Sequence, residues 1–312
     1  MTGATANCIL VTGATGVIGN ALVAELKDNG DQAVVGLSSR DADLTDFPTT
    51  LALFRRCRPT IVYHLAARVR GIMGNLRSQG QAYFDNVRIN TNVVEAARQV
   101  GARKVVAMGS AAVYSDDVPL PMKEQDIWLG PPHMSEAGYA HAKRGMLAQL
   151  QAYQDEYALD YAFCVSTNLF GPHDRFDEQN GHVLPSLISK FHRASGEGQA
   201  VTVWGSGEPR RDFLYSKDAA RAIRLIGEQF TGPINLATGT SVSIREIAEV
   251  IRYIVRPEIK IHWDRSKPDG QKLRDYDVSK LSSLGFRCDY SLATALTETY
   301  HWYAEHAAEA RR

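Results

Sequence analysis

Short apolar runs alternate with longer amphipathic stretches through the first half of the chain, and this alternation limits the fold more than any other feature. The stretches 17–30 and 90–101 have apolar residues at helical spacing, and each ends in a glycine that suits a left-handed cap. Strands that alternate with helices form a parallel sheet covered on both faces, and ligands bind at the carboxyl ends of its strands. The sequence therefore predicts an α/β fold with a doubly wound parallel sheet. Its expected strands are 8–13, 32–37, 60–67, 104–110 and 161–168.

The character of the chain changes after Asn168. A loop rich in glycine, proline and charge precedes a helix that opens near Pro185, and the run 201–204 has strand character. The segment 232–239 again has strand character and can rejoin the first sheet. We therefore expect a smaller, discontinuous second domain over the strand ends. The expected boundaries are 1–170 plus about 213–240 for dinucleotide binding, and about 171–212 plus 241–312 for substrate binding.

Charge and composition disfavour several classes of protein. Lys plus Arg equals Asp plus Glu, 35 against 35, so no net field favours nucleic acid or an anionic membrane as a partner. The N-terminal segment has a short apolar run and no basic region, so we expect neither a signal peptide nor a membrane anchor. The four cysteines are scattered without a CxxC pair, which favours reduced thiols over a metal site. A cytoplasmic protein without a metal is expected.

A glycine-rich turn follows the first expected strand. The stretch "VTGATGVIG" carries Gly13, Gly16 and Gly19 as GxxGxxG where the strand gives way to a helix. Glycines allow a tight turn and a close approach of the backbone to a pyrophosphate, which binds at the helix N-terminus. No GxxxxGK[ST] motif is present, which disfavours a P-loop. The turn therefore predicts a Rossmann-type dinucleotide site.

The end of the second strand distinguishes the two nicotinamide dinucleotides. NAD sites have an acidic residue there for the ribose 2′-hydroxyl, whereas an arginine suits the 2′-phosphate of NADP. Ser39 and Arg40 occupy this position, so NADP(H) is favoured, although a lone arginine is also common as a solvated surface cation. The residues expected at the cofactor are Gly13, Thr15, Gly16, Val17, Ile18, Gly19, Ser39, Arg40, Asp43, Leu44, Leu65, Ala66, Ala67, Lys143, Asn168 and His182.

A tyrosine and a lysine one helical turn apart mark a candidate catalytic helix. In "EAGYAHAKRG", Tyr139 and Lys143 project from one helix face, about 30 residues after Ser110. The spacing alone is weak, because Tyr276 and Lys280 repeat it in the second domain, where no cofactor strand is expected. Position within the strand–helix alternation therefore selects the Tyr139 motif.

Reduction of a ketone needs these residue types. Hydride addition builds negative charge on the carbonyl oxygen, which then needs a proton donor. A lysine ammonium about 4 Å from a phenol is worth about 4 kcal/mol at an effective dielectric of about 20, enough to bring the pKa of a tyrosine from about 10 toward neutrality. We therefore expect Lys143 to lower the pKa of Tyr139, and Ser110 to donate a second hydrogen bond to the same oxygen.

Longer segments resemble a known family over essentially the full chain. The turn, Ser110 and the Tyr139 motif are similar to those of the extended short-chain dehydrogenase/reductases, and 167–194, 201–214 and 266–278 resemble the GDP-L-fucose synthase family among them. That family epimerises a GDP-4-keto-6-deoxy sugar at C3 and C5 and then reduces the C4 ketone with NADPH. The resemblance implies a GDP-sugar substrate, NADP(H) and a homodimer.

The resemblance also implies roles for individual residues. His182 in "NGHVLP" would be an acid/base group, whereas without the resemblance it is better explained as a histidine hydrogen-bonded at a helix start. The implied reductive triad is Ser110, Tyr139 and Lys143. Around the substrate, the cations carry charge that a diphosphate needs and the tryptophan offers a stacking face, although each alone is also an ordinary surface or core residue. The implied substrate residues are Asn168, Lys190, Trp204, Arg211 and Asp269, the last near a ribose.

Two positions depart from the family pattern. Thr15 replaces an arginine that is usual in the cofactor turn, which leaves more of the 2′-phosphate to Arg40. Ala112 replaces the cysteine that removes the acidic proton beside the ketone, and a methyl group accepts no proton. Cys164 lies in mid-strand, where a buried, inert thiol is expected.

We therefore expect a C4 reductase that has lost the double epimerisation. Three alternatives stay open at this point. One keeps both activities, with another residue or a water-bridged His182 in place of the cysteine. Another is an epimerase that recycles its own bound cofactor. The third is a non-catalytic dinucleotide-sensing protein, against which the joint presence of Ser110, Tyr139 and Lys143 argues.

Overall fold

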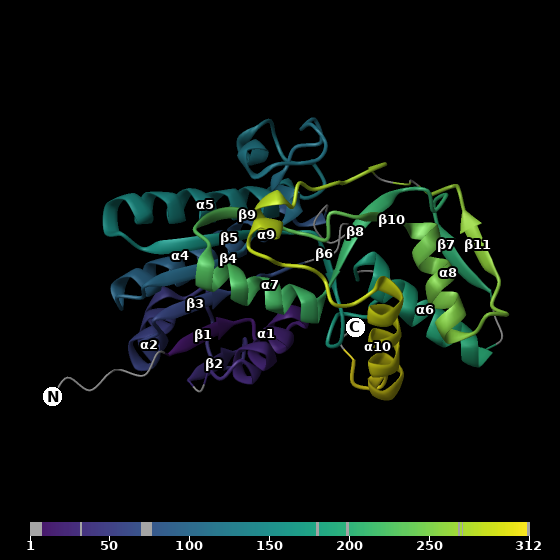
Figure 1. The fold of residues 1–312 in the computed structure, drawn as a ribbon, viewed down its shortest axis with the longest axis horizontal. Helices are drawn as coiled ribbons and strands as arrows, with labels where there is room; N and C mark the ends of the chain where they lie inside the picture. The colour runs from purple at the N-terminus through teal and green to yellow at the C-terminus, as the bar shows by residue number, and fades with distance from the viewer. Residues whose placement is uncertain are drawn as a thin grey trace.

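A six-stranded parallel sheet organises the N-terminal part of the chain (Figure 1). The computed structural model describes residues 8–31, 33–69, 77–178, 181–197, 200–267, 269 and 271–310. The spatial order of the strands is β2-β1-β3-β4-β5-β9, and all neighbouring pairs are parallel. Because the chain moves outward from β1 to β2 and then returns to β3, the strand ends beside β1 are a topological switch point. The strands are β1 (Ile9–Thr12), β2 (Val34–Leu37), β3 (Ile61–His64), β4 (Lys104–Met108), β5 (Asp160–Ser166) and β9 (Gly232–Leu236).

Helices cover both faces of this sheet. On one face, Phe54, Val94 and Leu147 from three helices share a core with the sheet. On the other face, Leu22 and Ile223 from two helices complete a second core. The doubly wound α/β fold predicted from the sequence is thus confirmed. The helices of the first face are α2 (Phe47–Cys57), α4 (Gln79–Gln99) and α5 (Ala137–Tyr157), and those of the second are α1 (Val17–Asp28) and α7 (Ser216–Gln229).

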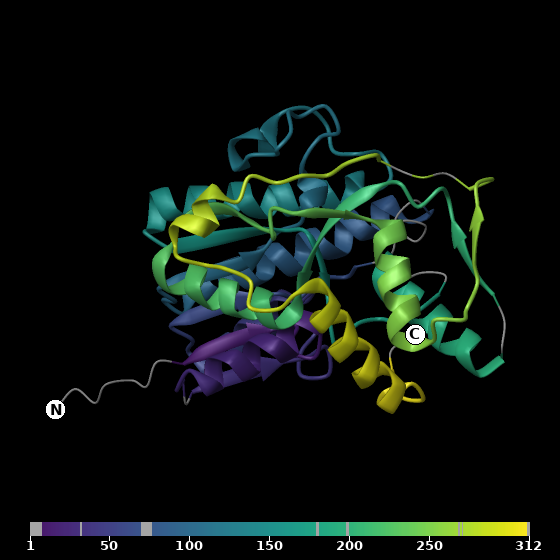
Figure 2. The same ribbon diagram turned by 45° about the vertical axis from the view of Figure 1, so that its right-hand side comes forward.

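Most of the remaining elements gather at the end of the molecule far from β2 and α2 (Figures 1 and 2). Strand β6 follows β5 directly, and β8 leads directly into α7, so the chain crosses between the two regions at these points. The described strands here form two small sheets, ordered β10-β8-β6 and β11-β7. A third core of Leu187, Phe191, Ile247 and Leu296 holds this region together. Its elements are β6 (Asn168–Phe170), α6 (Val183–Glu197), β7 (Val201–Trp204), β8 (Arg210–Tyr215), β10 (Ser241–Ser243), α8 (Ile244–Val255), β11 (Ile261–Asp264) and α10 (Leu292–His306).

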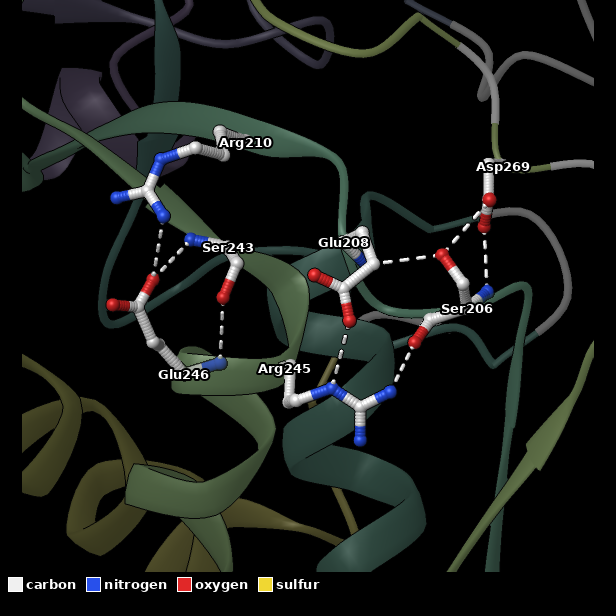
Figure 3. Close-up of polar contacts among 7 residues, drawn as sticks. All are labelled: Ser206, Glu208, Arg210, Ser243, Arg245, Glu246 and Asp269. Carbon is white, nitrogen blue, oxygen red and sulfur yellow. Dashed lines mark hydrogen bonds and ion pairs between the residues drawn. The ribbon is translucent and has the colours of Figure 1, made fainter.

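Short connecting elements and capping side chains complete the fold. Helix α8 opens with a capping box, in which Ser243 accepts the N–H of Glu246 at 3.1 Å and Glu246 accepts the N–H of Ser243 at 2.6 Å (Figure 3). Among the helices that the structure describes, none is long and apolar enough to cross a membrane. The connecting elements are the 3₁₀ turns η1 (Ala111–Val113) and η2 (Glu124–Trp128) and the short helix α9 (Ser279–Ser283).

Candidate active site

A cavity of about 1210 Å³ runs along the carboxyl ends of the parallel strands. Its wall includes Gly13 after β1, Leu65 after β3 and Ser110 after β4. A pocket for one small ligand occupies about 300–1,000 Å³, so this space has room for a dinucleotide and a second ligand. The predicted site residues that line it are Gly13, Thr15, Gly16, Val17, Ile18, Gly19, Ser39, Asp43, Leu44, Leu65, Ala66, Ala67, Ser110, Tyr139, Lys143, Asn168, His182 and Arg211.

The glycine-rich turn after β1 has no room for side chains. A Cβ on Gly19 would lie 2.1 Å from the carbonyl oxygen of Gly13 and 2.6 Å from Cα of Ala14. Gly13 has a φ of +73°, and a Cβ there would lie 2.9 Å from the backbone nitrogen of Ala66. Helix α1 begins after Gly16, and no described side chain caps it. The first N–H groups of α1 are therefore available to an anion, and the turn fits a pyrophosphate.

A buried chain of polar side chains supports this turn from below. The hydroxyl of Thr12 accepts the N–H of Ala66 at 3.2 Å and lies 2.9 Å from Nδ1 of His64. Nε2 of His64 lies 3.2 Å from Oδ1 of Asn90, in helix α4. Burial lowers the pKa of His64 to about 3, so the ring is neutral at working pH. This row of hydrogen-bonded side chains connects β1, β3 and α4 at the cofactor turn. It was not predicted from the sequence.

Asp41, the acidic side chain nearest the end of β2, accepts its hydrogen bonds from the turn in which it lies. Ser38 donates its N–H and its hydroxyl to the carboxylate of Asp41, both at 2.7 Å, and these bonds hold the pKa of Asp41 below its usual value. Ser39 and Asp43 line the cavity, whereas Arg40 is exposed and lies outside the wall. The rim at this strand end therefore combines serine hydroxyl groups with the carboxylate of Asp43, and an exposed arginine lies beside them.

Helix α5 brings Tyr139 and Lys143 to the same cavity as Ser110. Lys143 is fully buried, its Nζ donates to the carbonyl oxygen of Met108 at 2.8 Å, and it lies 5.7 Å from the ring centroid of Tyr139. Oγ of Ser110 accepts the N–H of Ala112 at 3.2 Å. Because this bond uses only a lone pair, the hydroxyl proton of Ser110 remains for a ligand.

Burial governs the protonation of the tyrosine and the lysine. Desolvation raises the pKa of Tyr139, with the charge of Glu136 as a smaller cause. Desolvation also lowers the pKa of Lys143 to about 7. This differs from the expected lowering of the tyrosine pKa by the lysine, because here the cost of burying each charged form exceeds their mutual attraction. Tyr139 therefore keeps its proton at neutral pH, as a proton donor must.

Ala112 lies in a small apolar cluster in the cavity wall. It is 3% exposed and packs with Ala82, Ala140 and Tyr139. Cys164 lies in β5, where it is fully buried, and burial raises its pKa to about 12. As expected from the sequence, Cys164 is an inert core thiol, and it does not reach the cavity wall.

Two ionisable side chains that the sequence reasoning missed also line the cavity, His133 and Glu136. Nδ1 of His133 accepts the N–H of Ser135 at 3.2 Å and lies 2.6 Å from its hydroxyl. Nε2 of the same ring lies 3.5 Å from the carboxylate of Asp116. Both nitrogens of His133 are thus engaged, while Glu136 is close enough to Tyr139 to raise the pKa of that phenol.

Arg211 and Arg274 are two of the arginines that line the cavity. Arg211, in β8, is mostly buried and donates to the carbonyl oxygen of Arg210 at 2.8 Å. Burial lowers the pKa of Arg211, and the nearby charge of Arg274 lowers it further. Within the described ranges, neither Arg211 nor Arg274 forms an ion pair. Two neighbouring positive charges that are not paired with a described carboxylate suit an anionic ligand. No local pattern in the sequence predicts the role of Arg274.

Three of the predicted substrate residues lie outside the cavity wall. Nζ of Lys190 lies 5.8 Å from the ring centroid of Trp204, which is 57% exposed at the end of β7. The carboxylate of Asp269 accepts the N–H of Ser206 at 2.6 Å and its hydroxyl at 2.8 Å (Figure 3). Trp204 and Lys190 thus present a ring face and a charge, while Asp269 holds the turn after β7.

A family comparison accounts for the first of the two regions. The model of the NAD dependent epimerase/dehydratase family matches residues 9–237, which include all six strands of the large sheet, the glycine-rich turn and the Tyr139 motif. The chain belongs to the NAD dependent epimerase/dehydratase family. The family resemblance stated from the sequence is thereby confirmed at this level.

Similar proteins extend the match to nearly the whole chain. GDP-L-fucose synthase 1 of Arabidopsis thaliana is 35% identical over 298 residues, 95% of this chain and 92% of that protein. The crystal structure of a GDP-L-fucose synthetase from Naegleria fowleri bound to NADP has a TM-score of 0.92 at 34% identity, covering 100% of this chain and 97% of that one. MlghC, a GDP-mannoheptose C4 reductase from Campylobacter jejuni with NADP bound, has a TM-score of 0.85 at 25% identity, covering 96% and 99%.

Proposed function

We propose that the protein uses NADPH to reduce the C4 ketone of a GDP-4-keto-6-deoxy sugar, a hexose or a heptose, without epimerising C3 or C5. The observation that carries the proposal is a cavity wall in which Ser110, Tyr139 and Lys143 accompany Ala112 in place of a thiol. The names of the Arabidopsis, Naegleria and Campylobacter proteins support a GDP-sugar substrate. The NADP in two of these structures supports the cofactor.

The residues along the strand ends suit the dinucleotide. The turn at Gly13 and Gly19 brings backbone N–H groups to a pyrophosphate, because no side chain intervenes. Ser39 and Arg40 offer hydroxyl and guanidinium donors for a 2′-phosphate. When bound, NADPH supplies the hydride for the reaction.

Tyr139 and Ser110 act on the carbonyl oxygen of the substrate. Tyr139 holds its proton at neutral pH and donates it to the oxygen as negative charge develops there. Ser110 donates a second hydrogen bond, because its oxygen already accepts from Ala112 and its proton is uncommitted. Lys143, which burial leaves partly protonated near neutral pH, lies beside the ring to offset the phenolate charge that remains.

The described cavity wall keeps His182, one of the two acid/base groups that epimerisation in this family would use, but it supplies no thiol as the second group. Ala112 offers only a methyl group, and Cys164 is buried outside the cavity with its pKa raised to about 12. Both ring nitrogens of His133 are engaged, by Ser135 and by Asp116. Loss of a positioned base slows proton abstraction by about 10²–10⁴-fold, which favours reduction without epimerisation.

A reaction in D₂O tests this proposal. The protein is given NADPH and GDP-4-keto-6-deoxy-mannose, then the heptose analogue, and the product is examined by NMR for deuterium at C3 and C5. We expect NADPH consumption with neither carbon labelled. The Tyr139→Phe variant should lose about 10²–10⁴-fold in rate while it still binds NADPH. Failure of the wild type to turn over either sugar would contradict the proposed activity.

A second candidate is the bifunctional 3,5-epimerase and 4-reductase. One observation favours it: the carboxylate of Glu136 lines the cavity close to Tyr139 and is able to accept a proton. Deuterium at both C3 and C5 would select this candidate. Glu136→Gln should then remove the label while reduction at C4 continues, because the amide preserves the shape but accepts no proton at this pH.

We further propose that different parts of the chain bind the two ligands. Residues 1–170 with about 213–240 would hold the dinucleotide, and about 171–212 with 241–312 would hold the sugar nucleotide. The enzyme is proposed to act in the cytoplasm as a homodimer, as the family resemblance implies. Light scattering on the purified protein tests the dimer directly.

A further inference from the structure

Tyr276 has a buried hydroxyl group that finds no hydrogen-bond partner among the described residues. The side chain is 3% exposed and lines the large cavity. In the part of the chain that the structure describes, its phenolic oxygen makes no hydrogen bond. Buried polar groups are nearly always paired, so an unpaired hydroxyl in a cavity wall indicates that a ligand pairs with it.

The backbone around Tyr276 holds the ring in place. Met122 donates its N–H to the carbonyl oxygen of Asp275, and Asp277 donates its N–H to the carbonyl oxygen of Met122, both at 2.9 Å. The ring itself packs in the first core of the large sheet. A phenylalanine would fill the same volume, so packing alone does not explain the hydroxyl group.

The polar neighbours of Tyr276 are already committed to other partners. Thr167 lowers the pKa of the phenol as a nearby hydrogen-bonding side chain, and the Thr167 hydroxyl donates its own proton to the carbonyl oxygen of Asp212 at 2.9 Å. The carboxylate of Asp212 accepts the N–H groups of Thr238, Gly239 and Thr240. Among the described residues none meets the phenolic oxygen in hydrogen-bond geometry, so its proton is available to an acceptor that enters the cavity.

The charges around Tyr276 indicate what that acceptor is. Arg211 and Arg274 line the same cavity and lower the pKa of the phenol through their charges, while the charge of Asp212 acts in the opposite direction. Phosphate oxygens carry negative charge, accept hydrogen bonds and donate none when ionised. They match two guanidinium groups and one phenolic donor better than a sugar hydroxyl does.

We propose that Tyr276 donates its phenolic proton in a hydrogen bond to a phosphate oxygen of the bound nucleoside diphosphate, between Arg211 and Arg274. This inference rests on the proposed GDP-sugar function and adds a residue to the same site. Tyr276 is thus a binding residue, and the resemblance to the Tyr139 motif in its spacing to Lys280 is incidental.

Calorimetric titration of the full chain with GDP and with guanosine tests the proposal. Tyr276→Phe should weaken GDP binding about 10- to 100-fold, the usual effect of losing a hydrogen bond to a charged group. Guanosine binding should not change, because guanosine has no phosphate. The thermal unfolding midpoint of the ligand-free variant should also not fall, because the lost hydroxyl has no partner in the fold.

Tyr114→Phe is the matched control. Its hydroxyl is equally buried but donates to Oδ1 of Asn235 at 2.6 Å, away from the cavity wall. This variant should lower the unfolding midpoint and leave GDP affinity unchanged. If Tyr276→Phe leaves GDP affinity unchanged, or weakens GDP and guanosine equally, the phosphate contact is wrong. If the wild type itself binds no GDP, the proposed function fails before Tyr276 is tested.

Discussion

Replacement of Lys143 by methionine should make the ligand-free protein more stable at neutral pH while it abolishes catalysis. Lys143 is fully buried, and its Nζ donates to the carbonyl oxygen of Met108. Burial lowers its pKa to about 7, from the ordinary lysine value of 10.5 that applies to the unfolded chain. Between these values the unfolded state binds the proton and the folded state does not. The stability of the wild type therefore rises with pH across this window and is least below pH 7.

The size of the effect follows from the width of that window. Each pH unit is worth about 1.4 kcal/mol for one group, so Lys143 alone changes the free energy of unfolding by up to about 5 kcal/mol between pH 7 and 10.5. Methionine fills similar volume without a charge and contributes no such slope. Lys143→Met should thus exceed the wild type in stability by a few kcal/mol near pH 7, and this advantage should vanish by about pH 10.5. The lost hydrogen bond to Met108 subtracts about 1 kcal/mol throughout.

Urea unfolding of wild type and variant at several pH values from 6 to 10 measures this difference, because other titrating groups cancel between the two proteins. Lys104→Met is the matched control. Lys104 is also buried, but its Nζ forms an ion pair with Asp160 at 3.1 Å and donates to the carbonyl oxygen of Phe230 at 2.7 Å. Its loss should destabilise the protein at neutral pH. A Lys143→Met variant that is less stable than wild type at pH 7, or whose advantage does not depend on pH, would refute the reasoning.

Three further outcomes test the cavity. Ala112→Cys should restore a proton acceptor and raise deuterium incorporation at C3 and C5 by about 10²–10⁴-fold, and unlabelled product would show that a thiol cannot act from this position. Gly19→Ala should abolish NADPH binding measured by calorimetry, since the added Cβ would lie 2.1 Å from the carbonyl oxygen of Gly13. Gly145→Ala is the control and should bind NADPH normally, because a Cβ at that position meets no atom within 4 Å. Arg40→Ala should reduce the preference for NADPH over NADH in kcat/KM by about 10- to 100-fold, and an unchanged ratio would make Arg40 a surface cation only.

The cofactor end of the site could be predicted from the sequence because it depends on short-range pattern. Gly19 lies six residues after Gly13 in one turn, and the clash that excludes a side chain at Gly19 involves Gly13 and Ala14 of that same turn. Tyr139 and Lys143 share a helix face because their spacing equals one turn. Each of these features depends on residues of one short segment, so it can be predicted from that segment alone.

The substrate end is different, because its residues come from segments far apart in the chain. Arg274 and Tyr276 belong to a C-terminal stretch without a recognisable motif, and backbone bonds to Met122 hold Tyr276 against the cavity. Asp269, which is predicted near a ribose, holds Ser206 in a turn through its carboxylate, a contact that the local sequence does not reveal (Figure 3). Spacing along the chain contains no information about such neighbours.

By itself, then, the sequence determined the order of the elements, the parallel sheet, the cofactor turn and the choice of the side chains proposed to react. Those properties follow from hydrophobic period, glycine geometry and helical spacing, which all act within about a dozen residues. Only the tertiary structure decided the protonation of Tyr139 and Lys143 and the unpaired hydroxyl of Tyr276. The reason is that desolvation and hydrogen bonding depend on every atom packed around a group, and the fold brings those atoms from distant parts of the chain.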